Sequence, residues 1–145
     1  MLRSEAILKG ILPEEAACLA FNGIMDRNVG YDFILKGKYK VEVRARHDFE
    51  NGKPYRLTLT PKKMDISNII IAVHYDRYHE ISCALLIRTL SLTSLYHEYL
   101  QKSGKQAHLN WNKILALVNG RDAIDVTDRL ISADKKLRAK GLYTC

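Results

Sequence analysis

Alternating polar and apolar residues mark two short strands in the first third of the chain. From Tyr39 to Arg46 the odd-numbered residues are apolar or aromatic and the even-numbered residues are charged. This period of two is typical of a strand that buries one face. An apolar segment at residues 31–35 precedes it, and a Lys-Gly-Lys tripeptide between the two favours a turn. The pattern predicts a hairpin with strands at about 31–35 and 38–46.

The rest of the chain divides into a leading helix, further strands and a helical C-terminal third. Two continuous apolar runs, at residues 68–73 and 81–87, are typical of strands buried on both faces. An Asn-Gly pair and a proline within 49–54 favour a hairpin loop between the second strand and a third. Periodicity predicts the other elements as a helix over 4–27 with its main part from about residue 13, a strand at 55–60, and helices at 91–101, 110–118 and 123–140.

This order of elements predicts a single domain of the α/β (α+β) class over residues 1–145. About five strands would form a mixed central sheet, flanked by the N-terminal helix and the C-terminal helices. A chain of 145 residues is long enough to bury a substantial core. We expect the core of the domain at about residues 10–90 and a helical extension at about 91–145.

Composition argues against a membrane or secreted protein. The sequence has no apolar run near the roughly 20 residues that span a bilayer. Charged residues Glu5 and Lys9 interrupt the segment in which a signal peptide would be apolar. Its three cysteines are far apart and match no zinc spacing, which favours reduced thiols. These features predict a cytoplasmic protein without a membrane partner.

Positive charge is concentrated around the predicted hairpin. The chain carries a net charge of +7, and residues 36–63 hold nine Lys or Arg against three Asp or Glu. A basic field of this kind suits a polyanion such as DNA, although a solvated lysine-rich surface is the simpler reading of composition alone. The candidate nucleic-acid-binding residues are Lys36, Lys38, Lys40, Arg46, Lys62 and Lys63.

Candidate chemistry lies on the hairpin itself. Asp32 stands at the start of its first strand, where a hairpin can bring it close to Glu42 in the second. Because side chains alternate along a strand, Glu42 and Arg44 share one face. Two carboxylates and a cation that converge in this way suit a hard divalent ion together with a phosphate.

The same residues resemble the PD-(D/E)xK nuclease superfamily, the restriction-endonuclease-like fold that includes archaeal Holliday-junction resolvases. The resemblance covers about residues 10–90, and its motifs are short. It rests on Glu14 in the leading helix, Tyr31-Asp32-Phe33 and Val41-Glu42-Val43-Arg44 in successive strands, and the apolar strands after residue 68.

The resemblance implies a nuclease that cleaves DNA phosphodiesters with Mg²⁺ or Mn²⁺. By this resemblance Asp32 and Glu42 are the metal ligands, the carbonyl of Val43 is a possible third ligand, and Glu14 is an auxiliary acid. Arg44 stands where the family usually has a lysine, and no proline precedes Asp32. An arginine keeps its charge, so it binds phosphate or stabilises developing charge but does not deprotonate water.

Three readings of this departure stay open. Another lysine (Lys40, Lys62 or Lys63) takes over the usual role, or the metal-bound water suffices. Alternatively, the chain is a non-catalytic nucleic-acid-binding module or an interaction subunit on the same fold. We also predict a homodimer through the C-terminal third, because that part is richer in apolar residues than a three-helix cover needs. The residues behind this prediction are Leu92, Leu95, Tyr96, Tyr99, Trp111 and Leu115.

Overall fold

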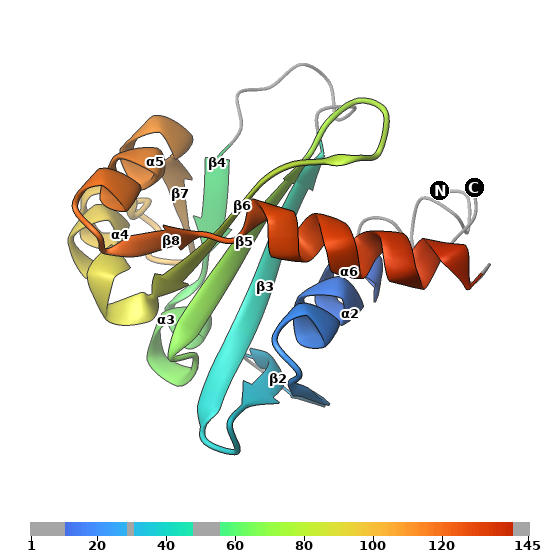
Figure 1. The fold of residues 1–145 in the computed structure, drawn as a ribbon. Coiled ribbons are helices and arrows are strands. Elements are labelled where there is room, and N and C mark those ends of the chain that lie inside the picture. Colours follow the sequence, from blue (N-terminus) through green and yellow to red (C-terminus); the bar gives the residue numbers. More distant parts are fainter. Residues whose placement is uncertain (1–10, 29–30, 48–55, 141–145) are drawn as a thin grey trace.

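A six-stranded mixed sheet lies at the centre of the computed structural model, which describes residues 11–28, 31–47 and 56–140 (Figure 1). Neighbouring strands run antiparallel except for the central pair β3 and β5, which is parallel. The α/β (α+β) class predicted from the sequence is therefore confirmed. In spatial order the strands are β1 (Ile24–Asn28), β2 (Tyr31–Leu35), β3 (Tyr39–His47), β5 (Ile69–Tyr75), β6 (Ile81–Arg88) and β8 (Ala123–Asp125).

The β2–β3 hairpin forms as its alternating pattern predicts. Its turn needs two residues in the left-handed region, and Lys36 at φ +52° and Gly37 at φ +72° provide them. The Lys38 amide donates to the Leu35 carbonyl at 3.2 Å and closes the turn. Asp32 and Glu42 are thereby placed on adjacent strands.

Two separate cores lie on the two faces of the sheet. On one face, the helices α2 (Leu12–Ala20) and α6 (Thr127–Ala139) cover a core that includes Phe33, Val41 and Val43. We call this the first face. Odd-numbered residues of β3 point into it, so the even-numbered residues, Glu42 among them, point to the opposite, second face.

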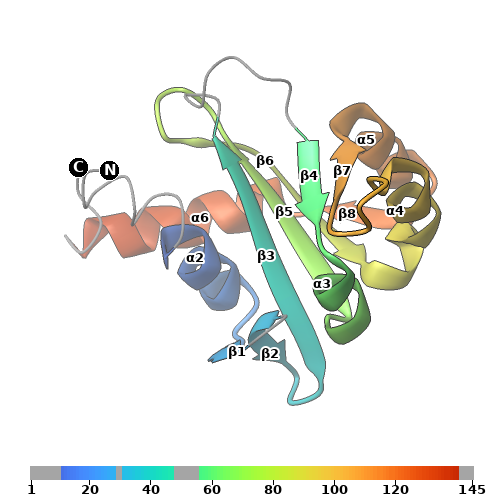
Figure 2. The same cartoon turned by 180° about the vertical axis from the view of Figure 1, so that it is seen from behind.

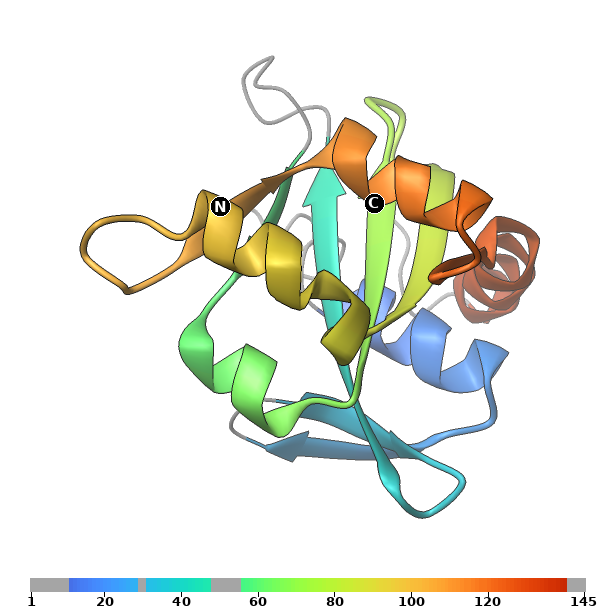
Figure 3. The same ribbon diagram turned by 90° about the vertical axis from the view of Figure 1, so that its left-hand side faces the viewer.

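The second face is covered by a small sheet and three short helices (Figures 2 and 3). Its core combines Ile70 of β5 and Ile87 of β6 with Leu57 and Leu109 of the small sheet. The covering elements are β4 (Arg56–Leu59) paired with β7 (Ala107–Asn110), α3 (Pro61–Ile66), η2 (Thr89–Leu92) leading into α4 (Thr93–Tyr99), and α5 (Trp111–Asn119).

Within the described residues, no helix has the length and apolar character needed to cross a membrane.

The helix predicted over residues 4–27 is wrong after Ala20. Asn22 adopts φ +54°, which ends the helix, and Ile24–Asn28 pairs with β2 as an edge strand. Ile24, which lies within the predicted helix, is 70% exposed on this edge strand. A Cβ at Gly23 would lie 2.5 Å from a ring carbon of Phe33, so glycine lets the chain turn close against the sheet. Residues 4–10 of the predicted helix lie outside the described residues.

The third predicted strand belongs to a different sheet from the one expected. Arg56–Leu59 pairs with β7, whereas β3 pairs in parallel with β5. The continuous apolar run of β5 needs burial on both faces, so it takes the central position beside β3. β4 has one apolar face and lies over the second core instead. The hairpin loop predicted at 49–54 lies outside the described residues.

The C-terminal third contains the three predicted helices, but also two strands that the pattern did not reveal. Asn110 caps α5 as its sequence suggests, since its side chain accepts from the Asn112 amide at 2.9 Å. β7 and β8 span four and three residues, too few for a period to be visible. The last helix accordingly starts at Thr127, after β8, and not at residue 123.

The apolar residues behind the predicted homodimer are largely used within the chain. All of them except Leu115 belong to the second core or pack against it, where the unforeseen strand β7 gives them a surface to cover. Of the six, Leu115 alone is exposed, at 37%. The homodimer stays a prediction, but most of the apolar surface that motivated it is buried.

Candidate functional site

Asp32 and Glu42 lie close together at the point where the regular pairing between β2 and β3 ends. Regular pairing of these strands runs from Leu35 opposite Tyr39 to Phe33 opposite Val41. Just beyond it, Oδ2 of Asp32 accepts a hydrogen bond from the Val43 amide at 2.8 Å. The carboxylate of Asp32 thus takes the place of a backbone acceptor, and this anchors it next to Glu42.

The carbonyl of Val43 belongs to the same edge of β3. In a strand, the N–H and C=O of one residue point to the same side. Since the Val43 amide points to Asp32, the Val43 carbonyl also points towards β2 and not towards β5. The geometry therefore gathers the oxygens of Asp32, Glu42 and this carbonyl in one region, and the ligand role of Val43 stays a prediction.

Lys63 covers Glu42 from the second face. Its Nζ lies 2.5 Å from Oε1 of Glu42, and the Glu42 side chain is only 5% exposed. Pro61 ends β4 and starts α3, and this short helix brings Lys63 back over β3. The neighbouring Lys62 is exposed, and the ammonium of Lys40 lies 5.6 Å from the centre of the Tyr31 ring. Lys40, Lys62 and Lys63 were the three candidates for the lysine that the resemblance implies. Of these, Lys63 is the one that contacts the Glu42 carboxylate.

Burial is the main reason why the pKa of Glu42 lies above its ordinary value, and the nearby charge of Asp32 raises it further. The hydrogen bond and charge of Lys63, followed by the charge of Arg44, act in the opposite direction. Two carboxylates close together in a buried place repel each other, and a bound cation relieves that repulsion. The electrostatics of the pair thus fit a cation site.

Glu42→Gln is expected to stabilise the protein at pH 7.5. A carboxyl whose pKa is raised by folding contributes stability below its unfolded pKa of about 4.5 and loses that contribution as pH rises through the folded pKa. The glutamine keeps the shape without the buried charge, so the difference in stability from wild type should be smallest near pH 4 and grow as pH rises above the unfolded pKa. Urea unfolding at a series of pH values measures it.

The matched control for this measurement is Glu98→Gln. Glu98 also pairs with a lysine, with 3.1 Å between Lys113 Nζ and its Oε1, but both side chains are about half exposed. Exposed pairs contribute little to stability, so this variant should match wild type within about 0.5 kcal/mol. A Glu42→Gln variant less stable than wild type at pH 7.5 would mean that the Lys63 bond outweighs the burial of the charge.

Three further predicted site residues, Arg44, Lys36 and Lys38, lie on the same hairpin as Asp32 and Glu42. Arg44 is half-buried on the second face and close enough to affect the pKa of Glu42. Lys36 and Lys38 are exposed at the turn, where the Lys38 ammonium lies 4.8 Å from the centre of the Tyr39 ring. Their proposed contacts with nucleic acid stay predictions.

Glu14 is separated from the carboxylate pair by the layering of the fold. It is half-buried on α2, and this helix packs on the first face through Leu12, Ala16 and Ala17. The side chain of Glu42 points to the second face. An auxiliary role for Glu14 near the site therefore stays a prediction, one that needs its side chain to reach round the edge of the sheet.

The donor set at Asp32 and Glu42 suits magnesium better than zinc. Throughout the described ranges, no three or more His, Cys, Asp or Glu side chains converge as a metal site. Structural zinc requires about four protein ligands, whereas Mg²⁺ is commonly held by one or two carboxylates plus water and phosphate oxygens. Oδ1 of Asp32 and Oε2 of Glu42 are the carboxylate oxygens not used in the bonds to Val43 and Lys63.

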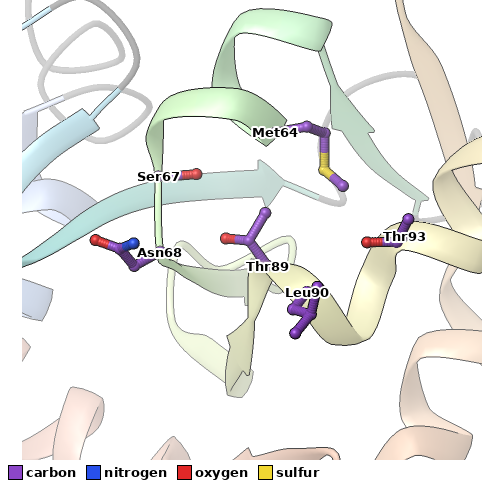
Figure 4. Close-up of a pocket in the computed structure, with 6 residues that line it drawn as sticks. All are labelled: Met64, Ser67, Asn68, Thr89, Leu90 and Thr93. Carbon is purple, nitrogen blue, oxygen red and sulfur yellow. The ribbon is translucent and has the colours of Figure 1, made fainter.

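A polar pocket of about 250 Å³ lies beyond α3, lined by Met64, Ser67, Asn68, Thr89, Leu90 and Thr93 (Figure 4). Ser67 is held by a hydrogen bond that it donates to the carbonyl of Lys63. Oγ1 of Thr89 is buried and has no hydrogen-bond partner among the described residues. The lining contains neutral groups only, so this pocket is not the metal site.

Two further polar residues, Arg56 and His108, gather near Arg46 at the other end of β3. Both lie close enough to be electrostatically linked, because Arg56 and Arg46 each lower the pKa of His108. The sequence pattern did not single out either residue. The alternation of Arg56 and Thr58 with buried leucines was the available signal, but nothing local connects β4 with β7.

Comparison with known proteins gives no match to a family model and no match to a curated protein. The resemblance to the PD-(D/E)xK superfamily consequently stays a prediction from the sequence motifs.

Proposed function

We propose that this protein is a metal-dependent endonuclease that hydrolyses DNA phosphodiester bonds at Asp32 and Glu42. The observation that supports it best is the state of Glu42, which is buried, close to Asp32 and covered by Lys63. Buried carboxylates placed side by side cost stability, and such arrangements are commonest at functional sites. The proposed DNA substrate agrees with the basic segment over residues 36–63.

The proposed cofactor is Mg²⁺ or Mn²⁺, held by Asp32, Glu42 and the carbonyl of Val43. When bound, such an ion polarises the phosphate and lowers the pKa of a coordinated water. Asp32 keeps its orientation through the Val43 amide, and its other carboxylate oxygen is not used in that bond. Because the Glu42 side chain is nearly inaccessible, the contact between Lys63 and Glu42 has to loosen before Asp32 and Glu42 can bind the same ion.

Lys63 and Arg44 are proposed to act on the reacting phosphate. Lys63 would exchange its bond to Glu42 for one to the attacking water or a phosphate oxygen, which gives the chain a lysine in place of the one replaced by Arg44. Arg44, on the same face, would stabilise the negative charge that develops on the phosphate. The proposed cytoplasmic location and homodimer are compatible with this role but add nothing to the argument.

A non-catalytic nucleic-acid-binding module is the second candidate. The contact between Lys63 and Glu42 favours it, since an ion pair whose carboxylate is buried can be purely structural. In that case the ion pair between Lys63 and Glu42 would hold α3 against β3, and the basic residues would bind the backbone without cutting it.

A cleavage assay separates the two candidates. Supercoiled, branched and single-stranded DNA are each incubated with the full chain in Mg²⁺, Mn²⁺ or EDTA. Nicked or linear products in either metal and none in EDTA are the expected result. DNA binding without cleavage in every metal would support the binding module, and absence of both would leave the interaction-subunit alternative.

A further inference from the structure

His108 lies at the centre of a polar cluster on the small sheet. It stands opposite Thr58 in the pairing of β4 with β7, and Oγ1 of Thr58 lies 2.8 Å from its Nδ1. The side-chain nitrogen of Gln106 lies 3.3 Å from its Nε2. The neighbouring residues Leu57 and Leu109 point into the second core. By alternation, this polar side of the small sheet faces away from the core.

Two arginines bring positive charge to this cluster from different strands. Burial is the main cause that lowers the pKa of His108, and the charges of Arg56 on β4 and Arg46 on β3 lower it further. Within the described ranges, Nε of Arg56 is buried and has no hydrogen-bond acceptor. A buried donor without an acceptor is costly, and a bound oxyanion would satisfy it.

The cluster is aligned with the carboxylate pair along β3. Arg46 follows Glu42 by four residues on the same face, which is about 13 Å at the rise of a strand. β4 contacts β3, and the start of β4 lies towards the C-terminal end of β3 (Figure 2). Arg56 is the first residue of β4, whereas α3, which follows β4, brings Lys63 to Glu42. One strand of B-form DNA rises about 3.4 Å per nucleotide, so a few nucleotides bridge the two places.

We propose that Arg46, Arg56 and His108 form a second phosphate-binding site, which holds the DNA backbone a few nucleotides from the phosphate at Asp32 and Glu42. Thr58 and Gln106 orient the imidazole, and the guanidinium of Arg56 supplies the donor that now has no acceptor. This inference rests on the proposed function in so far as DNA is the ligand, but it requires no cleavage. It aligns the bound strand with β3.

Binding of a fluorescein-labelled duplex of about 20 base pairs, measured in EDTA at several salt concentrations, tests the site. Arg56→Gln should weaken binding about tenfold at low salt and reduce the salt slope by about one, equally for two unrelated sequences. The matched control is Arg129→Gln on α6, where the guanidinium lies 5.0 Å from the centre of the Phe21 ring on the first face. It should change neither quantity.

A second variant and a melting curve guard against misfolding. His108→Gln changes no residue of β4 and should also weaken DNA binding. Since Nε of Arg56 has no acceptor among the described residues, Arg56→Gln should melt at or above the wild-type temperature, whereas a structural arginine would lower it. If Arg56→Gln does not fold, His108→Gln alone decides the test.

The outcomes also separate this site from the proposed function. Wild type that fails to bind DNA would overturn both, whereas normal binding by Arg56→Gln and His108→Gln would overturn the second site alone. A titration with inorganic phosphate, followed by NMR of His108, distinguishes a small anion from the DNA backbone. A response of His108 to phosphate, combined with unchanged DNA affinity in Arg56→Gln, would contradict the proposal as stated.

Discussion

Asp32→Ala and Glu42→Ala are each expected to lower the rate of DNA cleavage in Mg²⁺ by about a thousandfold or more. Each change removes one of two carboxylates proposed to hold the ion, and the electrostatic stabilisation lost with a catalytic metal amounts to several kcal/mol. Single-turnover cleavage measures the rate. Calorimetric titration with Mn²⁺ should show binding by wild type that is lost in both variants.

Asp26→Ala is the matched control for these two variants. Asp26 is a nearby carboxylate on β1 that accepts a hydrogen bond from the Tyr31 hydroxyl at 2.9 Å, and it is not part of the proposed site. It should cleave DNA and bind Mn²⁺ as wild type does. Equal Mn²⁺ binding by wild type and by both site variants would remove the metal site, whatever the cleavage data show.

Lys63→Ala is expected to lower the cleavage rate about a hundredfold while leaving Mn²⁺ binding intact or tighter. The loss reflects a positive group that acts on the reacting phosphate or water, worth on the order of 3 kcal/mol. Metal affinity should not fall, because the change frees the Glu42 oxygen that Lys63 now occupies. Single-turnover rates and calorimetry on the same preparation separate the two effects.

Lys113→Ala provides the comparison, since Lys113 also pairs with a glutamate but at an exposed position. It should retain both activities. A Lys63→Ala variant that cleaves normally would remove Lys63 from the mechanism. One that loses thermal stability and metal binding together would instead show that the pair holds α3 in place, as the binding-module alternative requires.

The hairpin that carries Asp32 and Glu42 was predictable because local signals specify it. Period-two alternation defines both strands and their faces, and the Lys-Gly-Lys turn sets which residues lie opposite each other. The start of α5 was likewise predictable from Asn110, because its cap involves only its immediate neighbours in the sequence. The concentration of positive charge at residues 36–63 is also a property of the sequence alone.

The tertiary structure decided what local patterns do not contain. The apolar spacing around Ile24 suits a helix, but the turn at Asn22 and Gly23 and the free edge of β2 make it a strand. β4 looked like the partner of β3, yet the doubly buried β5 takes that place and leaves β4 to pair with β7. In both places the burial of apolar residues in the whole sheet outweighs the local preference of the segment.

For the candidate site, the sequence by itself determined which carboxylates come together, and the tertiary structure decided which cations join them. Three lysines were equal candidates in the sequence, and only the path of β4 and α3 selects Lys63 for contact with Glu42. His108 and Arg46 are more than sixty positions apart in the sequence, but the packing of β4 and β7 beside β3 brings their charges together. Alternation and turn chemistry act over a few residues, whereas such neighbours arise from pairing between distant segments.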